Sequence, residues 1–563
     1  MKWFWWAIFA FFIIGLAAVA LPQLWYPFGF DQQVYAACGD VIRRGGVPIR
    51  DCFETKQPGV MAIYALPMLF TRAPAAVHAF TLLWQAGTSV VLALVARKVF
   101  RSWRSALIAA SLYWLIYAGI NYWSMDQAET FANVFLLLAF WFLLRGTDEA
   151  SQPDRSLFVA GLFIGIAFWF KYVFALIGIV FGAVFVVRLL LHRPRTYNPV
   201  RFAFLYGGGV LIVIALVLAY YAMVPGGLSS LGDQLTFLRD NFPLAPPRPW
   251  QQVIEQIARF ANNGADLSGD FKATLGEQTK AANVFGGGFP LVLVLSVFGV
   301  LRGLVPTRSG SARGIGPFAI ALLLAYLGGA LATVIWQGNY IQYHFTLLHV
   351  PIVLLAAGAV AAATDAPAPL ATTGTRQNSA QQARIFDGTG FIGVLVAVST
   401  LVFVVTAALL IFRMTPMMRD AWQNVMVERK PVAQMYLEGR QGANLAVADY
   451  LREHTTLNDS ISIFGDAPWV YTLSERRNAT NFAFVNVWIK KRGSPSYELF
   501  VSEWKSGLEF SQPIYVILTR ENFPWPNNSY LEDYKLALPI FEYVEAHYNY
   551  EGEVGPFLLY RRR

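Results

Sequence analysis

Residues 202–223 read FAFLYGGGVLIVIALVLAYYAM, a run without a charged or amide side chain. A helix of this length crosses the roughly 30 Å hydrocarbon core of a bilayer. Comparable runs recur through residues 1–413, and we assign eleven spans, at about 3–22, 75–96, 105–121, 127–144, 156–170, 173–190, 202–223, 288–304, 316–336, 344–363 and 390–412. The sequence therefore predicts a mainly α, polytopic transmembrane helical bundle.

The composition agrees with a membrane protein. Of the 563 residues, 56% are hydrophobic and 14% are charged, whereas a soluble domain carries about a quarter charged residues. Much of the formal net charge of +9 lies in short loops between apolar runs, a pattern that orients membrane helices. The basic balance therefore needs no nucleic acid partner, and we expect none.

The basic residues also orient the predicted spans. Arg and Lys cluster in three loops, at 97–104, 188–201 and 302–313, and all three fall on one side of the eleven-span arrangement. Such loops are normally cytoplasmic. We therefore expect a cytoplasmic N-terminus, retained as the first span, and long external loops at 23–74 and 224–287.

The tail of the chain differs in composition from the rest. Helix-like and strand-like runs alternate along it, at 442–451, 460–464, 513–518 and 555–560. This alternation is typical of a small α/β domain. We therefore divide the chain into a transmembrane domain, 1–413, and an extracytoplasmic α/β domain, 414–563, and no internal repeat is visible in either.

The first external loop gathers charged residues that are scarce in other external loops. Residues 28–70 read FGFDQQVYAACGDVIRRGGVPIRDCFETKQPGVMAIYALPMLF. Asp31 is placed to cap a helix that ends at Gly45-Gly46, and its one apolar face predicts that this helix lies in the membrane interface. Three more charged residues precede the next apolar helix: Asp51, Glu54 and Lys56.

This loop has two interpretations. It is either a solvated loop with one helix cap, or a site at the level of the lipid headgroups. The second is favoured because Lys56 directly precedes a membrane-entering helix, where a cation can meet a lipid phosphate.

The order of the loop residues resembles a family signature. An Asp, a Tyr-containing helix, an Arg-Gly-Gly-x-Pro turn and an Asp-x-x-Glu-x-Lys-x-Pro-Gly segment are similar to the first external loop of GT-C-type glycosyltransferases. The matching branch is the bacterial one related to protein O-mannosyltransferases and the lipid A aminoarabinose transferase. Its usual Lys-Pro-Pro-Gly is Lys56-Gln57-Pro58-Gly59 here. The resemblance implies a GT-C-like fold with a catalytic transmembrane domain.

The resemblance also implies roles for the loop residues. Asp31 would be the general base that removes a proton from the acceptor, and Lys56 would bind the donor phosphate. Glu54 would hold a metal ion or orient the acceptor, and Asp51 would belong to the same acidic cavity. A divalent metal is thereby suggested as a cofactor, although spacing does not identify its ligands.

Two acidic residues open the fourth span. Asp126 and Glu129 are three positions apart and are expected to share the first helical turn. Acidic side chains are favourable at a helix N-terminus in any protein, so simple capping is one interpretation. By the resemblance, this helix start faces the catalytic cavity, and a carboxylate as deep as Glu129 is costly unless it has a use.

Lys171 and His344 are further candidates for contact with the donor phosphate. Lys171 separates the fifth and sixth spans, and it either snorkels to the interface or binds phosphate. His344 ends the segment 336–344, which resembles a family segment that carries an arginine where this chain has Asn339. His344 contacts phosphate, joins Glu54 and Glu129 around a metal, or is simply hydrogen-bonded.

Cys38 and Cys52 are the two cysteines, and both lie in the first external loop. An oxidising exterior permits a disulfide, but it requires Cα atoms within about 7 Å. The alternative is that Cys38 packs on the apolar face of its helix.

Together these features favour an enzyme of cell envelope glycosylation. The resemblance implies an inverting hexosyl- or pentosyltransferase in the plasma membrane, whose partners are a polyprenyl-phosphate-linked sugar, membrane lipids, and a lipid, glycan or protein acceptor. The alternative is a transporter or flippase of lipid-linked sugars. Transporters commonly bind near the midplane between repeated halves, and neither feature is apparent here.

Overall fold

Helices build most of the structure up to Trp422. The computed structural model describes residues 15–120, 123–147, 152–192, 198–241, 249–263, 288–304, 317–360, 388–429, 440–489, 492–520 and 530–563. The helices of the bundle and its loops are η1 (Leu21–Trp25), α2 (Phe30–Arg43), α3 (Pro58–Met68), α4 (Pro74–Phe100), α5 (Trp103–Ala118), α6 (Ala128–Arg145), α7 (Pro153–Phe168), η3 (Tyr172–Phe174), α8 (Ala175–His192), α9 (Pro199–Ala222), α10 (Gly227–Asn241), α11 (Trp250–Asn263), α14 (Phe289–Leu304), α15 (Pro317–Gln337), η5 (Gln342–Leu348), α16 (His349–Ala359) and α18 (Gly388–Trp422), followed by a short π-helix, η6 (Gln423–Val427).

The predicted spans correspond to observed helices. Seven helical segments in the described residues are long and apolar enough to cross a membrane: 74–100, 128–145, 172–191, 199–222, 317–337, 342–359 and 394–412. Helices α5, α7 and α14 occupy three further predicted spans but have 16 residues each. The first predicted span lies mostly outside the described residues. The chain is thus a multi-pass membrane protein, and the total of eleven spans stays a prediction.

Small residues allow close helix crossings in the bundle. A Cβ on Gly161 of α7 would lie 2.0 Å from the backbone oxygen of Tyr206 in α9, and one on Gly209 would lie 2.2 Å from the oxygen of Phe158. Helices in lipid associate through such close contacts between small residues. These two glycines therefore fix the crossing of α7 and α9.

The tail forms the predicted α/β domain. Its elements are α20 (Arg440–His454), β1 (Ser460–Phe464), α21 (Trp469–Ser474), β2 (Arg477–Asn478), α22 (Asn486–Ile489), α23 (Pro495–Ser511), β3 (Tyr515–Thr519), α24 (Tyr530–Leu536), α25 (Leu538–His547), β4 (Tyr548–Val554) and β5 (Phe557–Arg562). The strand order is β2-β1-β3-β5-β4. Strand β1 is parallel to β2 and β3, and β5 is antiparallel to β3 and β4.

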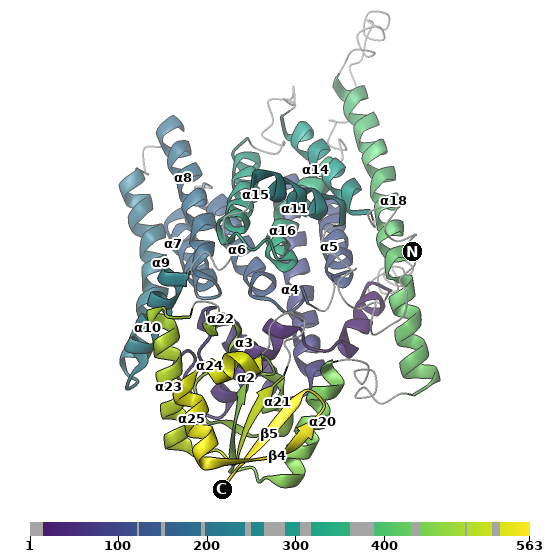
Figure 1. Cartoon of the computed structure of the whole chain (residues 1–563). Coiled ribbons are helices and arrows are strands. Elements are labelled where there is room, and N and C mark those ends of the chain that lie inside the picture. Colours follow the sequence, from purple (N-terminus) through teal and green to yellow (C-terminus); the bar gives the residue numbers. More distant parts are fainter. Residues whose placement is uncertain are drawn as a thin grey trace, which may run out of the picture.

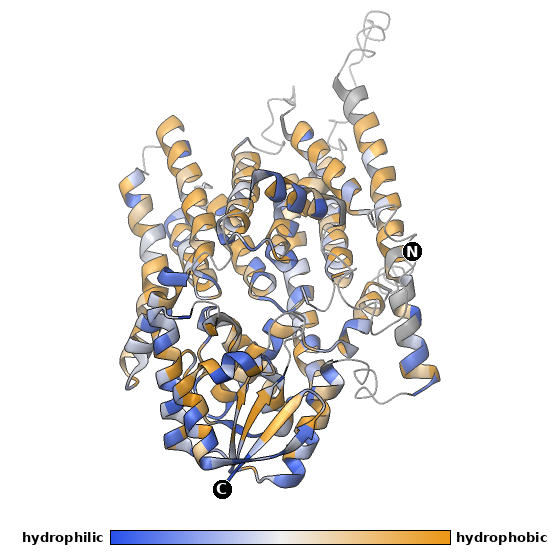
Figure 2. Cartoon of the chain, in the orientation of Figure 1, coloured by the Kyte–Doolittle hydropathy of each residue, from blue (hydrophilic) through white to orange (hydrophobic). Residues whose placement is uncertain are grey.

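The α/β domain sits at one end of the helical bundle, and α2 and α3 lie between the two parts (Figure 1). Apolar residues dominate helices of the bundle such as α8, α9 and α18, whereas polar residues are frequent on the outer helices of the α/β domain (Figure 2). Helix α2 is buried over most of its length, because α3 and α21 pack against it. The first external loop is therefore enclosed by protein on two sides.

Candidate active site

Helix α2 presents Asp31 from its first turn. The helix begins at Phe30, and its N-cap is Gly29, whose N–H donates to Oε1 of Gln32 at 2.6 Å. The expectation that Asp31 itself caps the helix is therefore wrong. Because Gln32 satisfies the cap, the carboxylate of Asp31 is left for a tertiary partner.

That partner is Lys56. Its Nζ donates to Oδ1 of Asp31 at 2.8 Å and lies 3.7 Å from Oε1 of Glu54. The side chains of Lys56 and Asp31 are 12% and 20% exposed. Gln234 of α10 holds the loop by donating to the backbone oxygens of Glu54 (2.7 Å) and Lys56 (3.0 Å). The loop and α2 thus form a positioned ion pair that solvent still reaches.

A second ion pair lies beside the first. Nζ of Lys171 donates to Oε1 of Glu129 at 2.6 Å, and Nε2 of His344 lies 4.0 Å from the same oxygen. Tyr343 joins the two pairs, since its hydroxyl donates to Asp31 while Nζ of Lys171 lies 5.6 Å from its ring centre. Residues from five segments of the chain are thereby gathered, and we call this set the Asp31 cluster: Asp31, Glu54, Lys56, Glu129, Lys171, Tyr343 and His344.

The cluster has polar atoms without a protein partner. In the part of the chain that the structure describes, Oε2 of Glu129 and Nδ1 of His344 are buried and accept or donate no hydrogen bond. Buried polar atoms in native proteins are nearly always satisfied. These two atoms are therefore the ones that a bound molecule would engage.

Burial and charge act in opposition on the titratable groups of the first pair. Burial raises the pKa of Asp31, but the charge and hydrogen bond of Lys56 outweigh it and hold that pKa below its ordinary value. Burial lowers the pKa of Lys56, and Asp31 and Glu54 more than reverse this. The pair is therefore ionised near neutral pH.

The flanking groups show the opposite balance. Burial raises the pKa of Glu54, with Lys56 opposing and the charge of Asp31 adding to the rise. Burial lowers the pKa of Lys171 despite its contact with Glu129. Both groups are thus closer to the neutral form than the same side chains would be in water.

Asp51 lies apart from the Asp31 cluster. Its carboxylate is paired with Arg50 at 2.7 Å and accepts the N–H of Val47 at 2.7 Å. It fixes the turn that follows Gly45-Gly46, so the structure does not bring it into the expected acidic cavity.

Asp126 is also separate from Glu129. It precedes α6, has a left-handed backbone (φ 56°), and places Oδ2 2.5 Å from Nδ1 of His78. The expectation that both carboxylates share the first helical turn is wrong, because the buried His78 binds Asp126 outside the helix. Glu129 alone reaches the cluster.

The suggested metal ligands are not assembled as a set. Within the described residues, no group of three or more His, Cys, Asp or Glu side chains is placed to hold a metal ion. Glu129 contacts Lys171 and lies near His344, whereas Glu54 faces Lys56. The metal assignment to these residues therefore has no geometric support.

Cys38 and Cys52 form a disulfide. Their Cα atoms are 5.3 Å apart, so the bridge that the sequence left open is present. It ties α2 to the segment that leads into Phe53 and Glu54, and thus joins the supports of Asp31 and Lys56.

Two contributors to the site were not identified from the sequence. Tyr343 is next to the predicted His344, but its bond to Asp31 spans segments about three hundred residues apart. Gln234 lies on an exposed helix of the second external loop, and no local pattern indicates its grip on the Lys56 loop.

Known proteins resemble the chain in sequence over one region and in fold throughout. Residues 58–221 match the family Dolichyl-phosphate-mannose-protein mannosyltransferase. No curated protein matches by sequence. A crystal structure of ArnT from Cupriavidus metallidurans bound to undecaprenyl phosphate is 13% identical, with a TM-score of 0.53, covering 98% of this chain and 97% of ArnT.

Two other solved structures are more distant. ArnT from the same organism in the apo state has a TM-score of 0.48 and 12% identity, covering 100% of this chain and 98% of that one. The oligosaccharyltransferase AglB from Archaeoglobus fulgidus, in complex with an inhibitory peptide and a dolichol-phosphate, has a TM-score of 0.42 and 14% identity, covering 96% and 70%. The chain therefore has the GT-C-type membrane glycosyltransferase fold of ArnT and is related to the protein mannosyltransferases through residues 58–221.

Proposed function

We propose that the chain is an inverting glycosyltransferase that moves a hexosyl or pentosyl group from a polyprenyl-phosphate donor to a lipid, glycan or protein acceptor. The observation that carries the proposal is the partly accessible ion pair between Asp31 and Lys56. A base and a phosphate ligand side by side are what such a transfer needs, and the similar ArnT was crystallised with undecaprenyl phosphate.

Asp31 acts as the general base in this proposal. Its carboxylate takes the proton of an acceptor hydroxyl, whose oxygen forms a bond to the anomeric carbon of the donor sugar. The bond between that carbon and the phosphate oxygen breaks, and the electron pair leaves with polyprenyl phosphate. Attack opposite the leaving group inverts the anomeric centre. The low pKa of Asp31 supports this role by keeping the base ionised.

The two lysines neutralise the leaving phosphate. Lys56 and Lys171 are both within the Asp31 cluster, and preorganised cations stabilise charge that develops in a transition state. His344 and Glu129 carry the unpartnered buried atoms, and they contact the phosphate and the sugar. Binding of the donor draws Lys56 toward the phosphate and so weakens its hold on Asp31.

The site is assigned to the external face of the plasma membrane. The basic loops at 97–104, 188–201 and 302–313 support cytoplasmic placement of the opposite side. The N-terminus is then cytoplasmic and the α/β domain extracytoplasmic. The disulfide in the first loop is consistent with this side, because such bonds persist in oxidising compartments.

The experiment compares Asp31→Asn with Asp51→Asn. Purified protein in nanodiscs is incubated with a panel of labelled polyprenyl-phosphate sugars and with lipid, glycan and peptide acceptors. We expect Asp31→Asn to lose about 10²- to 10⁴-fold in rate, as for removal of a general base. Asp51→Asn, which changes a carboxylate of the same loop outside the cluster, keeps wild-type activity.

Two outcomes contradict the proposal. Equal transfer by Asp31→Asn and wild type would show that another group is the base. Movement of labelled lipid across sealed vesicles without release of sugar would favour the alternative, a transporter or flippase of lipid-linked sugars.

A further inference from the structure

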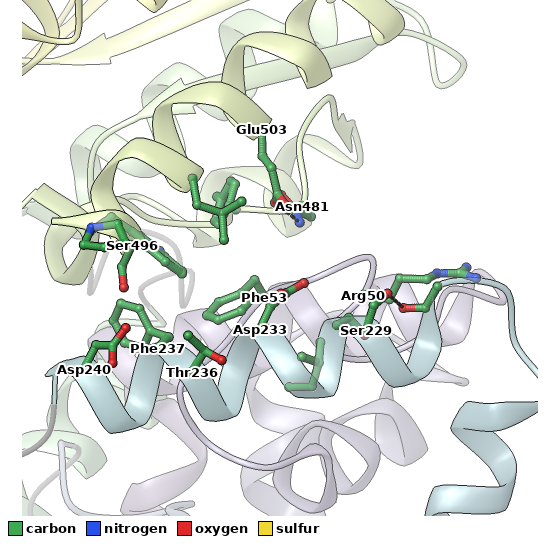
Figure 3. Close-up of a pocket in the computed structure, with 17 residues that line it drawn as sticks. Arg50, Phe53, Ser229, Asp233, Thr236, Phe237, Asp240, Asn481, Ser496 and Glu503 are labelled. Carbon is green, nitrogen blue, oxygen red and sulfur yellow. Dashed lines mark hydrogen bonds between the residues drawn. The ribbon is translucent and has the colours of Figure 1, made fainter.

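A cavity of about 330 Å³ lies between α10 and the α/β domain. Figure 3 shows Ser229, Asp233 and Thr236 on α10 facing Asn481 and Glu503 of the α/β domain. Ligand pockets in proteins begin at about this size. The cavity is outside the Asp31 cluster and has no role in the mechanism above.

One wall of the cavity is aromatic. Phe53, Phe237 and Trp488 line it, and their ring centres lie 4.6 Å (Phe53–Trp488) and 4.4 Å (Phe237–Trp488) apart. Aromatic rings offer a rigid apolar face on which the C–H face of a sugar ring can rest, while the hydroxyls need polar partners. The remaining lining provides such partners, because it is made of hydroxyl, amide and carboxylate groups.

The carboxylates of the cavity have spare hydrogen-bonding capacity. Glu503 accepts from Nδ2 of Asn481 at 3.2 Å, and burial raises its pKa, with the charge of Asp233 adding to the rise. Among the described lining residues Arg50 is the only base, and it is bound to Asp51 and to the oxygen of Pro225. A guest that donates hydrogen bonds therefore finds acceptors that no protein cation occupies.

The cavity adjoins the Asp31 cluster through one loop. Phe53 lines the cavity, and the next residue, Glu54, faces Lys56. Phe53 is held in place by its N–H, which donates to the oxygen of Asn481 at 2.7 Å. Gln234, next to Asp233 on α10, binds the backbone of the same loop. A molecule in the cavity is therefore held on the far side of the loop that carries Lys56.

We propose that this cavity binds a saccharide unit of the acceptor, with hydroxyl or ammonium groups directed at Asp233 and Glu503 and a ring face against the aromatic wall. The assignment of this saccharide as acceptor rests on the proposed function. The bound unit is distal to the reacting hydroxyl, so the cavity contributes to acceptor affinity rather than to the chemical step.

Direct binding tests the cavity without relying on transfer. Protein in nanodiscs is titrated with cellobiose, mannobiose and the disaccharide of glucosamine, and binding is followed by saturation-transfer NMR and calorimetry. We expect at least one of them to bind wild type. Asp233→Asn with Glu503→Gln should weaken binding about tenfold or more, in line with loss of hydrogen bonds to charged groups. A preference for the glucosamine disaccharide would identify an ammonium donor, and equal binding a hydroxyl donor.

Matched variants separate this effect from misfolding. Glu498→Gln changes an exposed carboxylate of the same helix, α23, that does not line the cavity, and it should bind as wild type. Ser229→Trp fills the cavity from an exposed position and should abolish binding with an unchanged thermal midpoint. With an active donor and acceptor, both cavity variants raise KM for the acceptor and leave kcat unchanged.

Two results would overturn the inference: no disaccharide of the panel binds wild type, or the cavity variants bind as tightly as Glu498→Gln. Asp31→Asn should bind saccharide as wild type does. If Asp31→Asn also transfers sugar normally, the proposed catalytic role fails while the cavity result stands.

Discussion

The two ends of α2 hold two carboxylates in contrasting environments. Asp40, near the C-terminal end, accepts from Arg43 and Arg44 at 2.8 Å and from Arg72 at 2.9 Å. Asp31, in the first turn, has one lysine and one tyrosine as partners. Both carboxyl groups have a pKa below the ordinary value, held down against burial by their cationic partners.

The contrast separates a structural ion network from a site. Asp40 is saturated by its arginines, and Arg72 continues to Glu475 of the α/β domain at 2.7 Å, so this network joins the two parts of the molecule. Asp31 is more exposed than Asp40, 20% against 8% for the side chains, and unpartnered polar atoms lie in its cluster. A lowered pKa alone therefore does not mark function; spare bonding capacity beside the group does.

Lys56→Met should produce the largest change at the Asp31 end. Removing a preorganised donor from a developing oxyanion costs about 10²- to 10³-fold in rate. Without the lysine, burial raises the pKa of Asp31, so the base is lost at a higher pH than in wild type. We therefore expect the acid limb of the pH–rate profile to move upward in pH, measured as kcat/KM across acidic buffers.

The control for this prediction is Lys98→Met, which removes a lysine from the end of α4. It should leave both the rate and the profile unchanged. An acid limb that stays in place in Lys56→Met would mean that Asp31 is not the group that titrates.

Asp40→Asn should act on stability instead of rate. It leaves three arginines without their shared carboxylate, and breaking a buried ion pair costs about 3–5 kcal/mol. Because the arginines are about a quarter exposed, we expect about 2–3 kcal/mol, seen as a lower thermal midpoint in detergent. Transfer well below that midpoint should be close to wild type, whereas loss of transfer at an unchanged midpoint would remove the distinction between the two ends.

Arg43→Ala should have the smallest effect of the three. It removes one of three partners of Asp40, in an i,i+3 pair at the helix surface, and such pairs contribute at most about 1 kcal/mol. The thermal midpoint should fall by less than in Asp40→Asn. A larger fall would show that the three arginines act as one cooperative unit.

The architecture could be predicted from local patterns, because membrane spans need long uncharged runs. The strands at 460–464, 513–518 and 555–560 also correspond closely to β1, β3 and β5. The errors arise where a tertiary partner decides the local structure. Gln32 takes the cap expected of Asp31, and His78 holds Asp126 outside α6.

The candidate site was predictable in its charged members and not in its geometry. Asp31, Glu54, Lys56, Glu129, Lys171 and His344 all reach one cluster, since charged residues at membrane depth are costly and few. Which lysine meets which carboxylate depends on how α2, α6 and η5 pack, and spacing along the chain carries no such information.

The disulfide between Cys38 and Cys52 gives the site a history in biogenesis. The cysteines meet a catalytic loop that must first be translocated, and the reducing cytosol keeps thiols apart until then. The Lys56 loop is thus covalently fixed to α2 only after export, close to where its lipid-linked substrate is found. A chain that fails to translocate this loop would carry free thiols and an unassembled ion pair, so an incorrectly inserted copy would be inactive as made.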